Sequence, residues 1–262
     1  MNDLRAAILR GARAVPRPGS AARGTRPGDG LAFSQLRAYV EGDDPRRIDQ
    51  AATARAGALQ TRVYREDTAL VLAAILDQSA SMRVGRHRSL AQAGKEALRA
   101  WFGVAEHDDT TARIVDERVV RDRRAAPLID AARANRLEAA LTIALRALPR
   151  GASLLMVTDG FDLVTDDLLQ RAGRRFDATV LLARDPWFEG LALRGTVRVR
   201  DSETGIVRGL IIGERERSRY HLATRRRAEL LQVRYRASGW RTGTLDERDG
   251  RASLFRAFGL PG

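Results

Sequence analysis

Two short apolar runs, each followed at once by oxygen-bearing side chains, constrain the fold of this chain more than any other feature. The first run is residues 70–76 and the second is residues 154–157. After them come Asp77, Ser79 and Ser81 in the first case and Thr158-Asp159-Gly160 in the second. Apolar runs of this length, each followed by a helical pattern, are typical of central parallel strands buried on both faces. Because ligands collect at the carboxyl ends of such strands, we expect these side chains at one edge of a sheet.

Strand-like and helix-like segments alternate from residue 69 to about residue 183. Strands are expected at residues 70–76, 111–115, 153–157 and 178–182, and helices at residues 89–105, 137–148 and 166–173. This alternation is typical of parallel strands joined by crossover helices. The expected fold class is therefore α/β, with a doubly wound, mostly parallel sheet.

The two ends of the chain have different patterns. Residues 196–200 and 205–212 predict a hairpin that could extend the sheet at its edge, and an arginine-rich helix is expected from about residue 214 to 237. Residues 1–27 contain three prolines and several glycines, which is typical of a flexible lead segment that contributes little to the core. The expected organisation is a lead segment (1–27), an upstream segment (28–68) and a main domain with a C-terminal extension (69–262).

The donor atoms at the predicted sheet edge are all oxygens. Asp77, Ser79, Ser81 and Asp159 have no His or Cys beside them, which suits Mg²⁺, Ca²⁺ or Mn²⁺ rather than Zn²⁺. The spacing of two residues lets one tight loop aim a carboxylate and both hydroxyls at a common point. The alternative is a helix-capping cluster, because Asp and Ser are preferred at helix starts. We favour the metal site because Asp159 ends a second strand.

These residues resemble a known family. Asp-x-Ser-x-Ser after a strand, with a later Thr-Asp-Gly, resembles the metal-ion-dependent adhesion site of von Willebrand factor A domains. Residues 36–49 (LRAYVEGDDPRRID) with Ala54-Arg55 resemble the signature of the bacterial DUF58 family, which couples such a segment to an A-type domain. Further similarity at residues 184–186, at residues 201–205 and around Gly239 extends the resemblance over roughly residues 28–260. It implies a von Willebrand factor A-like fold. From the turn signals and short apolar pieces of residues 28–68 we also expect the upstream segment to pack on the sheet.

The resemblance also implies a further oxygen ligand from a loop between the two strands, commonly a Thr. Asn135 stands at the matching place and offers a side-chain carbonyl oxygen. Its neighbour Arg136 brings a cation that would oppose a divalent ion if it pointed inward. Two states therefore stay open: a site of Asp77, Ser79, Ser81, Asn135 and Asp159 that holds Mg²⁺, Ca²⁺ or Mn²⁺, and a site that has lost its ion.

Unlike charges lie at short spacing in the upstream segment. Our interpretation is a structural ion-pair cluster, with direct ligand binding as the alternative. Its members are Arg37, Asp43, Asp44, Arg46, Arg47, Asp49 and Arg55.

The net charge of +13 raises the question of nucleic-acid binding, because clustered arginines can neutralise phosphates. The charge is spread along the chain, however, and only 5% of residues are aromatic. Lys95 is the only lysine among 46 basic residues, a bias more typical of a GC-rich genome than of a phosphate-binding surface. A nucleic-acid partner is therefore disfavoured.

The composition also bears on location. No apolar stretch approaches the roughly 20 residues needed to cross a bilayer, and the first residues lack the pattern of a signal peptide. The absence of cysteine excludes disulfides and thiolate zinc sites and agrees with a reducing compartment. We expect a cytoplasmic protein.

The leading functional hypothesis is a non-enzymatic interaction module in which an acidic residue of a partner completes the coordination of the ion. The family resemblance implies a MoxR-type AAA+ ATPase as partner, acting in protein assembly or maturation, and an acidic client protein is the other expected partner. The chain itself has no Gly-x-x-x-x-Gly-Lys-[Ser/Thr] phosphate loop. The alternatives are a metal-free scaffold and a Mg²⁺-dependent phosphoryl-transfer enzyme with an aspartyl nucleophile. Against the enzyme, Ser79 stands where such phosphatases have a second Asp.

Overall fold

The computed structural model divides the chain into two compact units. It describes residues 1–13, 32–65, 69–115, 117–122, 128, 136–161, 164–202 and 204–262. The main unit comprises Met1–Pro16 and Leu70–Gly262, and the upstream unit comprises Arg17–Ala69. Whether the upstream segment packs on the sheet stays a prediction.

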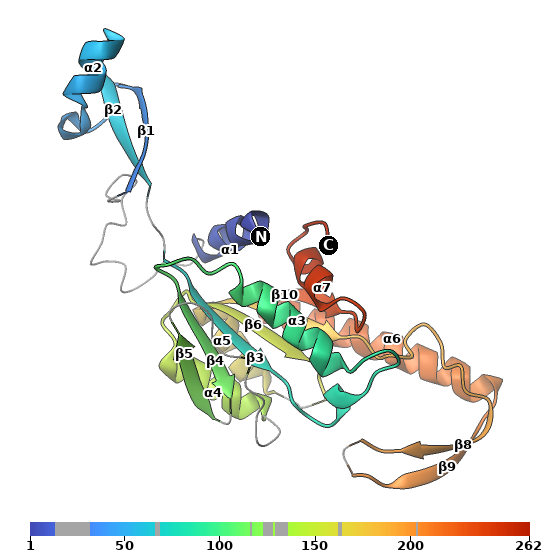
Figure 1. Ribbon diagram of the computed structural model, residues 1–262. Helices are drawn as coiled ribbons and strands as arrows, with labels where there is room; N and C mark the ends of the chain where they lie inside the picture. The colour runs from blue at the N-terminus through green and yellow to red at the C-terminus, as the bar shows by residue number, and fades with distance from the viewer. Residues whose placement is uncertain are drawn as a thin grey trace. The chain divides into compact units, whose positions relative to one another are not determined.

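A six-stranded sheet forms the centre of the main unit (Figure 1), with the order β10-β7-β6-β3-β4-β5. All neighbouring strands are parallel except β4 and β5, which form an antiparallel pair at one edge. The strands are β3 (Val71–Leu76), β4 (Thr110–Val115), β5 (Arg118–Asp122), β6 (Ser153–Thr158), β7 (Asp177–Ala183) and β10 (Arg241–Leu245). The expected mostly parallel α/β sheet is confirmed, and β5 and β10 are additions to it.

Helices cover both faces of this sheet (Figure 1). Alternate residues of β3 divide between two cores: Leu72, Ala74 and Leu76 belong to one, and Ala73 and Ile75 to the other. The first core includes residues of α1 (Asn2–Arg13), α3 (Leu90–Phe102) and α7 (Gly250–Ala257), and the second includes residues of α4 (Leu137–Ala147) and α5 (Asp166–Arg175). Burial on both faces explains why the central strands read as continuous apolar runs.

The expectation of a flexible lead segment differs from the structure at residues 2–13, which form α1. Leu4 and Ile8 are fully buried in the first core, and Arg5 hydrogen-bonds the Val104 carbonyl at 3.0 Å. Residues four apart share one helix face, so Leu4 and Ile8 form a short apolar stripe. The prolines that suggested flexibility begin only at Pro16, after the helix has ended.

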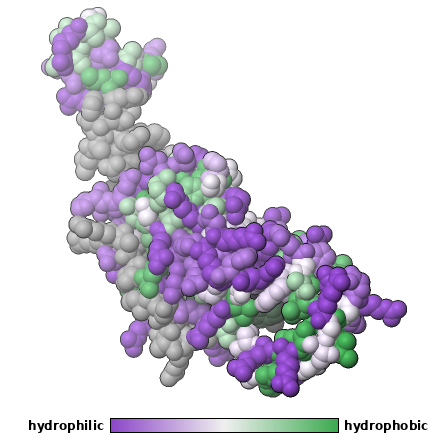
Figure 2. All heavy atoms as spheres, turned by 45° about the vertical axis from the view of Figure 1, so that its right-hand side comes forward, coloured by the Kyte–Doolittle hydropathy of each residue, from purple (hydrophilic) through white to green (hydrophobic). Residues whose placement is uncertain are grey.

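The predicted hairpin and C-terminal helix are present, but the hairpin does not extend the central sheet. Strands β8 (Gly195–Arg200) and β9 (Val207–Ile212) form a separate two-stranded sheet, followed by α6 (Glu214–Ala237). Apolar side chains gather on this hairpin (Figure 2), and Ile211 is 77% exposed. Among the described residues, no helix is both long and apolar enough to span a membrane.

The upstream unit is built on an antiparallel ladder between β1 (Ala32–Ala38) and β2 (Gln60–Arg65). Between the two strands lie a 3-10 turn, η2 (Pro45–Arg47), and the short helix α2 (Gln50–Ala56). Asp44 and Asp49 cap these two elements through side-chain bonds to backbone N–H groups.

Candidate metal centre

The ends of β3 and β6 meet at the carboxyl edge of the sheet. Their parallel register pairs Leu76 with Val157, and the backbone N–H of Asp77 donates to the Val157 carbonyl at 2.8 Å. Asp77 follows Leu76 and Thr158 follows Val157, so both residues lie at the same edge of the sheet. This adjacency is what the two apolar runs predicted.

Asp77 is a fully buried carboxylate held by hydrogen bonds from Ser79 and Thr158. The backbone N–H of Ser79 donates to Oδ1 at 2.9 Å, and the Thr158 hydroxyl donates to Oδ2 at 2.8 Å. Burial raises the pKa of Asp77, the hydrogen bonds from Ser79 and Thr158 oppose this rise, and the charge of Asp159 adds to it. A nearby cation would therefore stabilise the ionised form.

The hydroxyls of Ser79 and Ser81 lie 3.0 Å apart. An octahedron with Mg–O distances of 2.0–2.1 Å has edges of about 3 Å, so this spacing fits two neighbouring ligands of one Mg²⁺ ion. Hydroxyl and carboxylate oxygens are also the donors that a hard cation prefers. The residues present therefore fit a divalent ion.

The helix-capping alternative is wrong for this loop. The 3-10 turn η3 (Ser81–Arg83) has no side-chain cap at its start, where Ala80 stands. Helix α3 is capped instead by Ser89, whose side chain accepts from the Gln92 N–H in a capping box. Asp77, Ser79 and Ser81 are therefore not the side-chain caps of η3 or α3.

Asp159 comes from a tight loop after β6. Its Oδ1 accepts the Phe161 N–H at 2.9 Å, and the Gly160 N–H donates to the Thr158 hydroxyl at 2.9 Å. Gly160 has φ +74°, and a Cβ at this position would lie 2.7 Å from a methyl group of Leu231 on α6. Only glycine fits here without strain, because the backbone is left-handed and α6 packs directly against it.

Helix α6 brings a cation to this loop. The Arg227 guanidinium lies 3.4 Å from the ring centroid of Phe161. Burial lowers the pKa of Arg227, whereas the charges of Asp159 and Asp185 act in the opposite direction. Sequence reasoning missed Arg227, because nothing local distinguishes it within the run Arg225-Arg226-Arg227.

Of the two loop residues considered from the sequence, the structure describes Arg136 but not Asn135. Asn135 lies outside the described residues, so its role as a ligand stays a prediction. Arg136 is exposed and lines a groove with Glu117 and Glu138.

The sequence analysis considered Thr158 only as part of the Thr-Asp-Gly motif, whereas in the structure its hydroxyl donates a hydrogen bond to Asp77. Its signal was its place directly after the second apolar run.

Within the described part of the chain, no group of three or more His, Cys, Asp or Glu residues is arranged to hold a metal. The candidate site is of another kind, because it combines two carboxylates with hydroxyls. Its members in the described residues are Asp77, Ser79, Ser81, Thr158 and Asp159.

The predicted ion-pair cluster lies within the upstream unit, and its members Arg37, Asp43 and Asp49 take part in ion pairs there. Arg37 contacts Asp43 at 2.7 Å, and Asp49 contacts Arg62, which the sequence analysis had not included, at 2.9 Å. Hydrogen bonds with Arg37 and with the Val40 N–H hold the pKa of Asp43 below its usual value. Of the other members, Asp44 caps η2, Arg55 donates to its own helix at the Ala51 carbonyl, and Arg46 and Arg47 belong to η2 itself.

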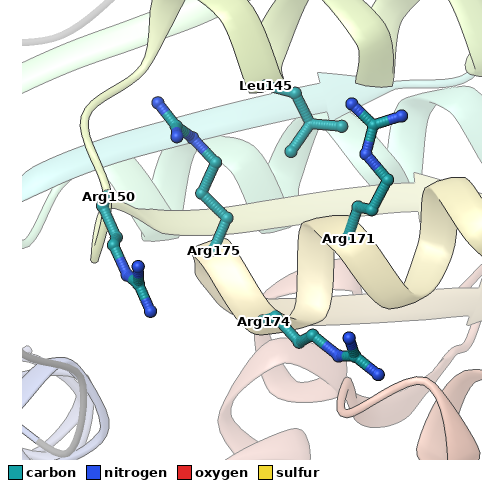
Figure 3. A pocket seen from close by; sticks show the side chains of 5 residues that line it. All are labelled: Leu145, Arg150, Arg171, Arg174 and Arg175. Carbon is teal, nitrogen blue, oxygen red and sulfur yellow. The ribbon is translucent and has the colours of Figure 1, made fainter.

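A separate arginine-lined groove of about 380 Å³ lies at the opposite, amino-terminal edge of the sheet (Figure 3). The guanidinium groups of Arg171 and Arg175 point to the side of Leu145, whereas those of Arg150 and Arg174 point away from it. Arg175 donates to the Leu148 carbonyl at the end of α4. Cations are stabilised at helix C-termini, so a structural role explains Arg175.

Comparisons with known proteins support part of the family resemblance. Residues 35–104 match the family described as "Protein of unknown function DUF58". This stretch contains Asp77, Ser79 and Ser81 but not Asp159, and it is less than half of the chain. No curated protein matches the sequence. One similar solved structure is that of the conserved hypothetical protein BatB from Bacteroides thetaiotaomicron, with 15% identity, a TM-score of 0.40, and coverage of 70% of this chain and 94% of that chain. At this TM-score we draw no conclusion from it.

Proposed function

We propose that the main unit is a von Willebrand factor A-like interaction module with a metal-ion-dependent adhesion-type site. The observation that carries this proposal is the pair of Ser79 and Ser81 hydroxyls, 3.0 Å apart, beside the buried carboxylate of Asp77. Asp159, on the loop after the neighbouring strand, adds a second negative charge.

In this proposal each residue has a separate role. Ser79 and Ser81 hold the ion through their hydroxyls, and Asp77 and Asp159 supply the compensating charge. Thr158 and the Ser79 N–H orient Asp77 by occupying one lone pair on each of its oxygens. When bound, a divalent ion supplies a positive charge with an open position for a partner's carboxylate oxygen.

The partner class follows from this chemistry together with the family resemblance. We expect an acidic side chain at the point of contact, on a MoxR-type AAA+ ATPase or on a client protein. The chain contains no phosphate-loop motif, so nucleotide hydrolysis would belong to the partner.

Phosphoryl transfer is the weaker candidate for this site. An aspartyl nucleophile needs an accessible carboxylate oxygen, whereas Asp77 is fully buried and both of its oxygens accept hydrogen bonds. Assay with a generic phosphatase substrate and Mg²⁺ is the direct check.

The test of the proposal is Mg²⁺ binding by titration calorimetry on the full chain. Wild type should bind, Asp77→Ala should not, and the exposed Asp108→Ala should bind as wild type does. Pull-down of a candidate ATPase with Mg²⁺ and then with chelator extends the test to the partner. Absence of Mg²⁺ binding in wild type would reject the metal-dependent function.

A further inference from the structure

One face of α6 is fixed on the loop that follows β7 and on the start of α5. The Tyr220 hydroxyl donates to Asp185 at 2.6 Å, and Arg234 contacts Asp166 at 2.6 Å. Between these two anchors, Leu231 packs against Gly160. The middle of α6 therefore lies against the loop that carries Asp159.

Arg227 occupies this middle stretch, one helical turn before Leu231. Its guanidinium lies 3.4 Å from the ring centroid of Phe161, and the Phe161 N–H is bonded to the Asp159 carboxylate. Arg227 is half-buried, which disfavours its charge, while Asp159 and Asp185 attract it. An anionic loop thus holds a partly desolvated cation within electrostatic reach of the candidate metal centre.

We propose that Arg227 is a built-in counter-ion of this site, which competes with the divalent ion for the charge of Asp159 and so couples metal binding to the docking of α6. The inference rests on the proposed function. It adds a residue that sets the metal affinity of the site.

The physical reason is charge balance. Without a metal, Asp77 and Asp159 are two neighbouring carboxylates, and one cation on α6 offsets part of their repulsion. A divalent ion offsets that repulsion more completely and repels the guanidinium. Metal binding should therefore weaken the contact between α6 and the Asp159 loop, and the contact should weaken metal binding by the same factor.

The neighbouring arginines are engaged differently. Arg225 lies 5.8 Å from the ring centroid of Phe188, and Arg234 is held by Asp166 and by the Val164 carbonyl. Arg226 is exposed, so Arg226→Gln removes the same charge from the same helix without touching the Asp159 loop. It is the matched control for Arg227→Gln.

The experiment is Mg²⁺ titration calorimetry on wild type, Arg227→Gln and Arg226→Gln, with Asp77→Asn as the variant that removes the site. We expect Arg227→Gln to bind Mg²⁺ with a Kd about tenfold lower than wild type, and Arg226→Gln to stay within about twofold of it. Amide hydrogen exchange gives a second readout: Mg²⁺ should speed exchange in residues 220–231 of wild type, and less so in Arg227→Gln.

The outcomes separate the two proposals. If Asp77→Asn abolishes binding but Arg227→Gln binds as wild type does or more weakly, the competition is overturned and the metal site stands. Equal tightening by Arg226→Gln would also overturn it, since the effect would then be one of overall charge. If neither wild type nor Arg227→Gln binds Mg²⁺, both the metal-dependent function and the competition are rejected. Thermal melts of each variant establish that it is folded.

Discussion

The Thr158 hydroxyl donates a hydrogen bond of 2.8 Å to Oδ2 of Asp77, although the two residues lie 81 positions apart in the sequence. The bond joins the first residue after β3 to the last residue of β6. Thr158 also accepts the Gly160 N–H, so one hydroxyl connects both halves of the candidate metal centre. The site is therefore pre-organised by the sheet rather than by either loop alone.

Replacing Thr158 by Val should destabilise the protein. Valine has nearly the same shape but leaves a buried Asp77 oxygen and the Gly160 N–H without their partner, at a cost of about 1–2 kcal/mol. Urea unfolding measures this loss. Thr142→Val on α4, where the hydroxyl bonds only its own helix, is the control and should change stability little. Equal losses in both variants would contradict a special role for Thr158.

Replacing Asp77 by Asn should stabilise the metal-free protein at neutral pH. Burial raises the pKa of Asp77 above its usual 3.8, so the folded state holds this proton to higher pH than the unfolded state does. The free energy of unfolding of wild type therefore falls as pH rises through this window, and it stays lower above it. Asn cannot ionise and escapes this loss.

Melts of wild type and Asp77→Asn across pH, in chelator, test this sign. The difference in stability between Asp77→Asn and wild type should be present at pH 7. It should shrink toward zero as pH falls below about 3.8, where both side chains are neutral. A variant that is less stable than wild type at pH 7 would contradict the prediction and would show that the hydrogen bonds from Ser79 and Thr158 outweigh the cost of burying the charge.

Replacing Gly160 by Ala should lower the stability of the protein more than the same change at another glycine with a left-handed backbone. Gly160 has φ +74° and a methyl group of Leu231 at 2.7 Å from its ideal Cβ, whereas Gly205 has φ +70° and nothing within 4 Å. Both variants carry backbone strain of about 1 kcal/mol or more, and only Gly160→Ala adds a clash with α6. Thermal unfolding of the two variants isolates the clash. Leu231→Ala in the Gly160→Ala background should recover part of the loss.

Replacing Leu4 by Ala should cost about 2–4 kcal/mol, because Leu4 is fully buried in the core formed with α3 and α7. Leu193→Ala is the comparison, since Leu193 is 41% exposed and should change stability by about 0.5 kcal/mol or less. Chemical denaturation measures both. A negligible effect at Leu4 would restore the expectation of a loosely attached lead segment.

Replacing Asp49 by Ala should loosen the upstream unit. The change removes the N-cap of α2, a bond of 2.9 Å to the Ala52 N–H, together with the pair with Arg62. Trypsin should then cut after Arg55 several-fold faster than in wild type. The exposed Glu41→Ala, which removes one negative charge nearby, should not change the rate. Rapid cutting at this site in wild type would argue against an ordered segment.

Much of the central sheet could be predicted from sequence, because the burial of a central strand is visible in the strand's own run of apolar residues. Strands buried on both faces are predominantly apolar, as β3 and residues 154–157 of β6 are. The sequence also predicted that Asp77 and Asp159 share an edge, since parallel strands end together. β10 was missed because it is an edge strand, Arg241–Leu245, whose residues apart from Leu245 are only partly buried. β5 was missed for a related reason, as an exposed or half-exposed antiparallel edge.

What only the tertiary structure decided is which distant groups meet these residues. The sequence determined an oxygen-rich edge on a parallel α/β sheet, through apolar runs and the residues that end them. It did not determine that Thr158 would bond Asp77 or that Arg227 rather than Arg226 would face Phe161. Those contacts depend on strand order and on how α6 docks across the sheet edge. Both are set by the sum of many packing interactions, which no short stretch of sequence contains.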